Sequence, residues 1–256
     1  MVFNFRILVL AAGLVVLMVV AIRTRPDGKV RVTFCNVGQG DGIIVTQNNF
    51  QMVIDTGVEN RKLLGCLERQ MPFWDKEIEM VVITHWDADH SGGLKGLSEN
   101  YKIDNLYGNG APKEIGEQKI YTDNLRKNDM IKYRQINFEV LNPDRDWGNE
   151  NDNSIVGLLS YGDKKVLLMG DVSGEVEQKL AWRQEVEKVT ILKITHHGSA
   201  AGTTPELLTA TRPEEAVISV GKNLFGQPNK TVLERLEANG IKIRRTDVEG
   251  DIIYEW

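Results

Sequence analysis

The feature that most constrains this chain is the position of its histidines, each of which lies in a motif that comes after a short apolar run. The 256 residues include four histidines, which form two motifs, His85 with His90 and His196 with His197. The first motif comes after residues 80–84 (MVVIT) and the second after residues 191–195 (ILKIT). Apolar runs of this length are typical of buried strands. Scattered histidines would serve as ordinary core or surface residues, whereas four at two strand ends predict a metal site.

Two further apolar runs end in the same way. Residues 165–169 lead into Gly170 and Asp171, and residues 216–220 lead into Gly221 and the 225–228 loop. The pattern also predicts strands over 30–36, 42–47 and 51–54, and helices over 59–70, 174–183, 205–210 and 230–238. Layered α/β proteins carry their chemistry where strand ends gather along one edge. We therefore expect an α/β fold whose site is built by strand-end loops.

The spacing within the first histidine motif suits two adjacent metal positions. In an extended chain His85, Asp87 and Asp89 point to the same side, and the turn at 91–93 begins a helix that swings His90 toward a neighbouring point. Two metals about 3.5–4 Å apart need a shared carboxylate, and we expect Asp171 to supply it. The mixture of imidazole and carboxylate suits Zn²⁺, Mn²⁺ or Fe.

Composition narrows the class of protein. Hydrophobic residues make up 41% and charged residues 26% of the chain, which excludes disorder, a coiled coil and a collagen-like repeat. The two cysteines, Cys35 and Cys66, are expected to be buried or idle thiols. Residues 1–25 carry three arginines and no acid, so the net charge of −5 leaves −5 − 3 = −8 for the rest. Broad capture of nucleic acid by a basic surface is therefore not expected, and an anionic substrate needs a metal or a few lysines.

The N-terminal segment is expected to lie outside the folded domain. Residues 7–22 are uncharged and apolar between Arg6 and Arg23, which favours a transmembrane anchor over residues 1–25, with a cleaved signal peptide as the alternative. Residues 26–29 form a linker and residues 30–256 the domain. The basic residues after the segment favour a cytoplasmic domain by the positive-inside rule, whereas a single N-terminal segment often exports the domain attached to it. We expect a membrane-anchored, extracytoplasmic domain.

Several motifs in order resemble one family. They are Val37-Gly38-Gln39-Gly40-Asp41, Ile54-Asp55-Thr56-Gly57, Thr84-His85-Trp86-Asp87-Ala88-Asp89-His90, Asn153-Ser154, Gly170-Asp171, His196-His197-Gly198-Ser199 and Thr246-Asp247. Together they resemble the metallo-β-lactamase-fold hydrolase domain of the ComEC type, the C-terminal part of the DNA-uptake competence protein. The resemblance spans about residue 30 to the C-terminus. It implies an αββα sandwich of two mixed β-sheets flanked by helices, with a metal site along one edge.

The resemblance also implies roles for individual residues. His85 and Asp87 would hold the first metal and Asp89 and His90 the second, with Asp171 between them. His196 or His197 would complete the ligands or contact the substrate, and Asp55 would orient the histidines. We further expect Asp89 to orient the attacking water and move its proton.

One position departs from the family pattern. The family usually has Tyr-Gly-His-Pro where this chain has Phe225-Gly226-Gln227-Pro228. An amide oxygen from Gln227 is a weaker ligand than the expected imidazole, so a single-metal or degenerate site is an alternative to two metals. Weaker candidates near the site are Asp41, Asn153, Ser154 and Ser199, which either assist the metals and substrate or only cap turns.

These expectations lead to one leading function and two alternatives. The leading hypothesis is a membrane-tethered hydrolase that cleaves phosphodiesters with a metal-activated water, acting on DNA, including single-stranded DNA, in a DNA-uptake context. A separate membrane channel is the expected partner, because this chain has one apolar segment and the full competence protein has many. The alternatives are a hydrolase of small esters, lactones or thioesters, and a surface binding module whose site has decayed.

Overall fold

The computed structural model describes residues 7–15, 18, 27–110 and 122–256. The strands form two sheets of seven strands each within these residues. The first sheet has the order β14-β1-β2-β3-β4-β5-β6. Its strands are β1 (Val30–Phe34), β2 (Ile43–Gln47), β3 (Phe50–Ile54), β4 (Glu77–Val82), β5 (Lys102–Gly108), β6 (Thr122–Asn124) and β14 (Ile252–Glu255).

The second sheet has the order β13-β12-β11-β10-β9-β8-β7. Its strands are β7 (Met130–Tyr133), β8 (Ile136–Asn142), β9 (Val156–Tyr161), β10 (Lys164–Leu168), β11 (Ile191–Lys193), β12 (Glu215–Ile218) and β13 (Lys242–Arg245). In both sheets parallel pairs such as β3·β4 and β10·β11 adjoin antiparallel ones. Both sheets are therefore mixed.

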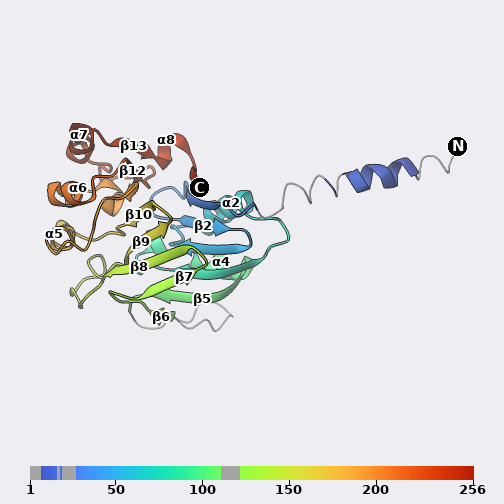
Figure 1. Ribbon diagram of the computed structural model, residues 1–256, viewed down its shortest axis with the longest axis horizontal. Helices are drawn as coiled ribbons and strands as arrows, with labels where there is room; N and C mark the ends of the chain where they lie inside the picture. The colour runs from blue at the N-terminus through green and yellow to red at the C-terminus, as the bar shows by residue number, and fades with distance from the viewer. Residues whose placement is uncertain (1–6, 16–17, 19–26, 111–121) are drawn as a thin grey trace.

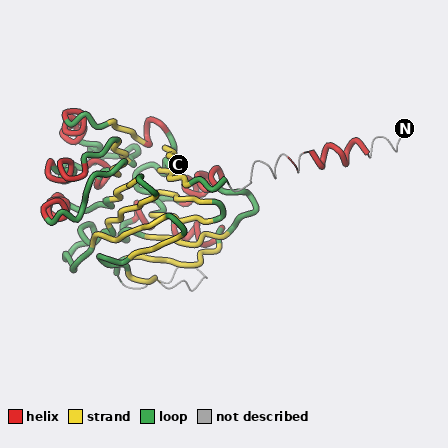
Figure 2. The backbone as a smooth tube through the Cα atoms, in the orientation of Figure 1, coloured by secondary structure: helices red, strands yellow, loops and turns green. Residues whose placement is uncertain are grey.

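Helices cover the outer face of each sheet. On the first sheet these are α2 (Asn60–Gln70) and α4 (Leu94–Asn100), with the short α3 (Ala88–Ser91) before α4; on the second they are α5 (Gly174–Trp182), α6 (Pro205–Thr211) and α7 (Lys230–Ala238). Figure 1 shows α5, α6 and α7 side by side along one side of the molecule, and Figure 2 shows the strands gathered between the helices. The remaining elements are the 3-10 turn η1 (Thr195–Gly198) and α8 (Thr246–Glu249).

Alternation along the strands explains the layers. Side chains such as Phe34 and Val45 from the first sheet pack against Phe138 and Ile191 from the second. Residues that alternate with them face the helices, as Ile44 and Val53 do toward Leu63 of α2. The same holds for Leu192 of the second sheet, which packs with residues of α5, α6 and α7. Successive strand residues point to opposite faces, so the two sheets share a central core. The expected αββα sandwich is confirmed.

The sequence pattern located most of the elements that border the site and missed others. The predicted helix 230–238 coincides with α7, and the predicted strand 216–220 overlaps β12. Strands β5, β6, β7, β8, β9, β13 and β14 were not predicted. Several of these carry charged residues, as in β13, whose sequence is KIRR, and such strands lack the apolar run on which the prediction relied.

The N-terminal segment lies largely outside the described residues. Residues 7–15 are helical and exposed. Among the residues that the structure describes, no helix reaches the length and hydropathy needed to cross a membrane. The anchor over residues 1–25 and the linker over 26–29 stay predictions.

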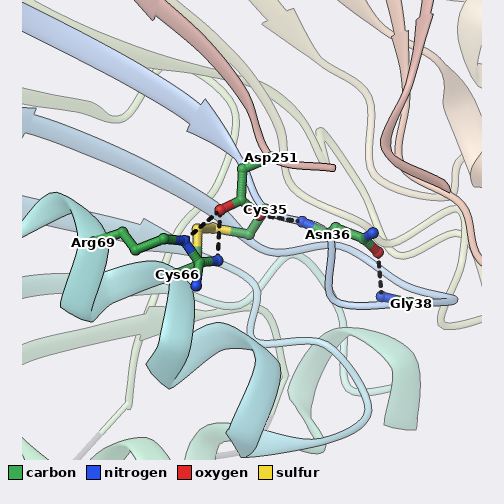
Figure 3. Close-up of a disulfide and its surroundings, with 6 residues drawn as sticks. All are labelled: Cys35, Asn36, Gly38, Cys66, Arg69 and Asp251. Carbon is green, nitrogen blue, oxygen red and sulfur yellow. Dashed lines mark hydrogen bonds and ion pairs between the residues drawn. A yellow bond between two sulfur atoms is a disulfide. The ribbon is translucent and has the colours of Figure 1, made fainter. Parts of the chain in front are cut away.

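The expectation of free thiols was wrong, because Cys35 and Cys66 form a disulfide (Figure 3). Both residues are buried, as expected. Cys35 lies just after β1 and Cys66 lies in α2, 31 positions later, and the packing of α2 on the sheet brings their Cα atoms to 6.0 Å. Such a pairing depends on tertiary structure, and two isolated cysteines give no sign of it in the sequence. Asp251 packs beside the bridge, where it accepts hydrogen bonds from the Asn36 amide and the Arg69 guanidinium.

Candidate metal centre

The candidate site lies where loops from the two sheets meet. His85 and His90 come after β4, Asp171 comes after β10, and His197 lies in the turn η1 after β11. Since β4 belongs to the first sheet and β10 and β11 to the second, the sandwich itself brings distant segments together at one edge. This is the convergence that the strand-end pattern predicted.

Four side chains converge most closely. One ligand atom from each of Asp89, His90, Asp171 and His197 lies within 4.8 Å of every other. His90 Nε2 lies 3.2 Å from Asp171 Oδ1, and His197 Nε2 lies 3.3 Å from Asp89 Oδ2 and 3.5 Å from Asp171 Oδ2. Two imidazoles and two carboxylates facing one point form a donor set that suits a divalent transition metal.

Hydrogen bonds on the far side of two imidazole rings orient them toward this point. His90 Nδ1 lies 2.8 Å from Asp55 Oδ2, and His197 Nδ1 donates to the Ser219 carbonyl oxygen at 2.8 Å. An acceptor at Nδ1 leaves the lone pair of a neutral imidazole on Nε2. In the described part of the chain, the buried Nε2 atoms of His85, His90 and His197 make no hydrogen bond of normal geometry, although a carboxylate oxygen lies 3.2 to 3.6 Å from each. Unpartnered buried nitrogens are costly, so their convergence fits a site built for a metal ion.

Asp55 is held rigidly under His90. It is fully buried and accepts hydrogen bonds from the Thr84 amide and the Thr84 hydroxyl, each at 2.7 Å. Its φ of +59° is unusual for a residue other than glycine. Backbone strain of this kind persists only where the surroundings fix it. Asp55 thus lies against Nδ1 of His90, and the orienting role that the family resemblance implied for it stays a prediction.

Neighbouring charges shift the pKa values of the converging side chains strongly in the metal-free protein. Burial alone would lower the pKa of His90, but the carboxylates of Asp171 and Asp55 raise it well above its usual value. Burial is likewise outweighed at His197, where Asp171 and Asp89 raise the pKa to about 9. Burial opposes ionisation of Asp171, yet the two imidazoles hold its pKa well below the usual range. The Asp89 pKa falls to about 2 through His197 and His90, against burial.

His85 differs from the other two buried histidines. Burial and the neighbouring His90 lower its pKa to about 4, so it is neutral at pH 7. Its Nδ1 lies 3.2 Å from both the Thr84 and Ser154 hydroxyl oxygens, and its Nε2 lies 3.6 Å from Asp87 Oδ2. The close groups among the described residues include neither His85 nor Asp87. The first metal position is therefore more open than the second, and the Asp87 side chain is 50% exposed.

The helix after the first motif begins earlier than expected. The α3 helix starts at Ala88 rather than after the 91–93 turn. Asp89 and His90 therefore leave the strand alternation that was expected to align Asp89 with His85 and Asp87. One helical turn carries Asp89 to the His197 side, whereas Asp87, at the N-cap of α3, stays near His85.

A buried lysine that the sequence analysis did not single out adds a positive charge beside the site. Lys193 on β11 is fully buried, forms an ion pair with Asp41, and lies 4.0 Å from Asp171 Oδ1. Burial lowers the pKa of Lys193, but Asp41 and Asp171 outweigh that effect and raise it. The sequence held one signal for this residue, because Lys193 interrupts an otherwise apolar strand. Asp41, a weaker candidate from the sequence, thus serves as the partner of a buried cation.

Gln227 occupies a different place from the ligand expected there. Its Oε1 accepts a hydrogen bond from Gln39 Nε2 at 2.8 Å, and its Nε2 donates to the His196 carbonyl oxygen at 3.1 Å. The amide oxygen of Gln227 therefore accepts one hydrogen bond from the loop before β2. His196 has its side chain 36% exposed, with Nε2 3.6 Å from Asp171 Oδ2.

The remaining candidates divide into two kinds. Ser154 contacts His85 and also accepts from the Asp171 amide at 3.3 Å, so it links two parts of the site. Asn153 instead bonds to Asp146 and the Trp147 amide, which stabilises its own loop. Ser199 lines a hollow of about 210 Å³ beside Asp171 and His196.

The glycine-rich segment before β2 forms a turn against the site. The Asp41 amide donates to the Asp89 carbonyl oxygen at 3.1 Å. Gly40 has a φ of +122°, and a Cβ there would lie 2.2 Å from the same carbonyl oxygen. Only glycine allows this close approach, so the segment is a tight turn beside the candidate site.

Known proteins resemble this chain over most of its length. "ComE operon protein 3" of Bacillus subtilis is 28% identical across 88% of this chain and 33% of its own length. "Recombination protein 2" of Haemophilus influenzae is 29% identical across 87% of this chain and 28% of its own length. "Competence protein ComA" of Neisseria gonorrhoeae is 28% identical across 90% of this chain and 33% of its own length. The chain spans about a third of the length of these relatives.

Solved structures share the fold. The metallo-beta-lactamase fold protein YhfI from Bacillus subtilis superposes with a TM-score of 0.63 at 10% identity, covering 89% of this chain and 100% of the other. A metallo hydrolase from the archaeon Ignicoccus hospitalis superposes with a TM-score of 0.57 at 16% identity, covering 89% and 99%. The family model described as "Metallo-beta-lactamase superfamily" matches residues 35–222. Because that match covers most of the chain, the protein belongs to the metallo-beta-lactamase superfamily.

Proposed function

We propose that this protein hydrolyses phosphodiester bonds of DNA, including single-stranded DNA, in a DNA-uptake context. The observation that carries the proposal is the convergence of Asp89, His90, Asp171 and His197 with unpartnered imidazole nitrogens. Such a centre activates water and neutralises charge on an anionic substrate. The relatives named "Competence protein ComA" and "Recombination protein 2" support DNA as the substrate.

Two metal positions of unequal completeness are implied by the side chains. Asp89, His90 and His197 would hold one divalent ion, and His85 with Asp87 the other, with Asp171 between them. Zn²⁺ and Mn²⁺ are the ions that this donor set favours. When bound, such ions lower the pKa of water and stabilise negative charge on the phosphate.

The chain's own residues prepare the site for that chemistry. Asp89 has its side chain 30% exposed and a pKa of about 2, so it is ionised at neutral pH and faces solvent. It orients the attacking water by accepting a hydrogen bond, and so weak a base passes the proton on to solvent. His196, at the hollow beside Asp171, is placed to contact a substrate phosphate.

The disulfide supports a location outside the cytoplasm. Disulfides persist in oxidising compartments and are rare in the cytosol, and Cys35 and Cys66 form one here. Together with the apolar N-terminal segment, this supports a domain tethered to the outer side of a membrane. A separate channel protein as partner stays a prediction.

Paired substrate assays test the function. The full chain is depleted of metal with a chelator, reloaded with Mn²⁺ or Zn²⁺, and given labelled single-stranded DNA, bis-p-nitrophenyl phosphate, nitrocefin and a lactone. We expect metal-dependent cleavage of the two phosphodiesters and its loss in Asp171→Asn. A folded, metal-loaded chain that leaves both phosphodiesters intact would refute the proposal, and turnover of only the lactone or nitrocefin would indicate the ester-hydrolase alternative.

A further inference from the structure

The loop that carries Gln227 exposes two apolar side chains next to the metal centre. Leu224 is fully exposed and Phe225 is 79% exposed. Exposure of a large aromatic side chain gains nothing for folding. Isolated exposed apolar residues are common on protein surfaces, so the case for a function depends on how the loop is built and on what lies beside it.

The loop is held in a single shape by one side chain. Asn223 donates from Nδ2 to the carbonyl oxygens of Gly221 and Gln227, at 2.9 and 2.8 Å. Its Oδ1 accepts from the amides of Phe225 and Gln227, at 3.0 and 3.1 Å. Four hydrogen bonds from one asparagine fix the backbone on both sides of Phe225. The aromatic ring is therefore presented on a preorganised loop.

The same loop is attached directly to the metal centre. Gln227 bonds to Gln39 and to the carbonyl oxygen of His196, the residue before the ligand His197. The Asn229 amide donates to the Gly198 carbonyl oxygen at 2.8 Å. A Cβ on Gly198 would lie 2.7 Å from the Pro228 Cβ, so the loop packs tightly on η1. Phe225 thus keeps a fixed position relative to His197.

Two lysines without an acidic partner lie along the same edge. Within the described residues, Lys62 and Lys222 form no ion pair, and both are exposed. Four other cations of this C-terminal region are paired with carboxylates, in Lys230–Glu234, Lys242–Glu215, Arg244–Glu249 and Arg245–Asp247. Arg235 donates to the Gly202 and Thr203 carbonyl oxygens instead. The basic residues 242–245 are therefore a poor phosphate site, whereas the charges of Lys62 and Lys222 have no paired carboxylate among the described residues.

The two lysines are linked through the glycine turn. A Cβ on Gly38 would lie 2.6 Å from Lys62 Nζ, and a Cβ on Gly221 would lie 2.4 Å from the Gly38 carbonyl carbon. These contacts form a continuous series. It begins at Lys62 on α2, passes through Gly38 and Gly221, and ends at Lys222 in the loop that carries Phe225. The Cys35–Cys66 disulfide ties α2, one turn after Lys62, to the start of the segment that reaches Gly38 (Figure 3).

We propose that Lys62, Lys222 and Phe225, here called the rim, bind one polynucleotide strand, with the lysines on its phosphates and Phe225 stacked on an unpaired base. This inference rests on the proposed phosphodiesterase function and names the residues that select the strand. A domain with net charge −8 outside its first 25 residues repels a polyanion overall, so unpaired cations at the catalytic edge are where a strand is held. Stacking on Phe225 requires a free base face, which a duplex does not offer.

Binding measurements with two matched probes test the rim. The full chain, in mild detergent and with a chelator present to prevent cleavage, is titrated against a labelled 20-nucleotide oligo-dT and against an abasic strand of equal length. We expect Phe225→Ala to weaken oligo-dT binding by about 5- to 100-fold and to leave abasic-strand binding unchanged, while Phe225→Trp retains oligo-dT binding. Lys62→Gln and Lys222→Gln each reduce the slope of log affinity against log salt by about 0.7 for both probes.

Two control variants separate the rim from general surface effects. Trp182 is 70% exposed at the end of α5, and Lys132 is an exposed lysine of the edge strand β7 without an ion-pair partner among the described residues. Trp182→Ala and Lys132→Gln should leave both affinities unchanged. Equal losses for oligo-dT and the abasic strand in Phe225→Ala, or no loss, would overturn the stacking assignment.

The outcome is distinguishable from failure of the proposed function. If the wild-type chain binds oligo-dT through Phe225 but cleaves no phosphodiester, the rim proposal stands and the proposed phosphodiesterase function is refuted. If wild type and Phe225→Ala cleave single-stranded DNA with the same KM, the phosphodiesterase proposal stands and the rim proposal is refuted.

Discussion

The carboxylate of Asp55 lies 2.8 Å from His90 Nδ1, on the side of the imidazole opposite the metal centre. This contact fixes which nitrogen of His90 faces Asp171 and Asp89. Because Asp55 also binds the Thr84 amide and hydroxyl, the orientation of His90 is set by the backbone between the first sheet and the histidine motif. The imidazole of His90 is therefore held in its orientation by protein groups on the side away from the candidate metal centre.

Replacing Asp55 should weaken metal binding while leaving every ligand in place. Removal of such a partner typically costs 10- to 100-fold in metal affinity, and we expect Asp55→Asn to fall in that range for Zn²⁺ measured by chelator competition. Asp144→Asn, which alters a carboxylate paired with Lys179 and Arg183 outside the site, is the matched control. An unchanged affinity in a folded Asp55→Asn protein would contradict the role given to this residue.

Metal binding should release protons and strengthen with rising pH. His197, with a pKa raised to about 9, and His90, raised well above its usual value, carry protons at pH 7 in the metal-free protein. A metal at Nε2 displaces them, so affinity rises with pH until it passes about 9. The same raised pKa means that the contribution of His197 to metal-free stability is present below pH 6.5 and lost through pH 9.

Calorimetry in two buffers of different ionisation enthalpy measures this release. We expect the number of protons released at pH 7 to approach two when the first metal ion binds. In a His197→Ala protein that still binds the metal ion, this number should fall toward one. His85 is neutral with a pKa of about 4 and contributes none. Release near zero at pH 7 would show that the two histidines are not ligands.

Replacing only one partner of the buried Lys193–Asp41 pair should lower the free energy of unfolding substantially. Lys193→Met leaves the buried Asp41 carboxylate without its closest cation, with only the rings of His90 and His197 as ion-pair partners within 4 Å among the described residues, which we expect to cost about 3 to 5 kcal/mol in the free energy of unfolding. The double variant Lys193→Met/Asp41→Asn removes both charges and should recover most of that loss, as urea unfolding of the metal-free protein would show. A double variant as unstable as the single one would mean that packing, and not charge, dominates there.

Loss of the disulfide should lower stability without removing the metal ligands. For a bridge that closes 31 positions of chain, the chain-entropy estimate is about 3 to 4 kcal/mol. Urea unfolding of Cys35→Ser/Cys66→Ser, compared with wild type with and without a reductant, measures it. We expect the reductant to destabilise wild type only; equal effects on both proteins would contradict a disulfide.

The parts of the site that sequence could predict are those that depend on local pattern. His85, His90, Asp171 and His197 all come after short apolar runs, and strand ends gather at one edge of a layered fold. Lys193, Ser219 and the Cys35–Cys66 bond depend on how distant elements pack. Lys193 is read as a surface or edge residue until β11 is known to be central in its sheet, and Ser219 acts through its backbone carbonyl, which no side-chain pattern marks.

The helix start at Ala88 and the bonds of Gln227 show a second limit. Alternation along a strand placed Asp87 near His85, but it did not foresee that the chain turns into α3 directly after Asp87, which brings Asp89 beside His197. Gln227 was compared with a histidine as a ligand, and its hydrogen bonds to Gln39 and His196 became visible only once two loops from different sheets were placed together.

The most direct test of the central claim is the metal content of the purified full chain by elemental analysis, after dialysis against a weak chelator. Wild type and Gln227→Ala should each retain about one or more equivalents of a divalent transition metal, because the four-residue group forms without Gln227. Asp171→Ala, which removes the carboxylate that would be shared by both metal positions, should retain less than about a tenth of that. Less than about half an equivalent in folded wild type, after reloading with Zn²⁺ or Mn²⁺, would contradict the account.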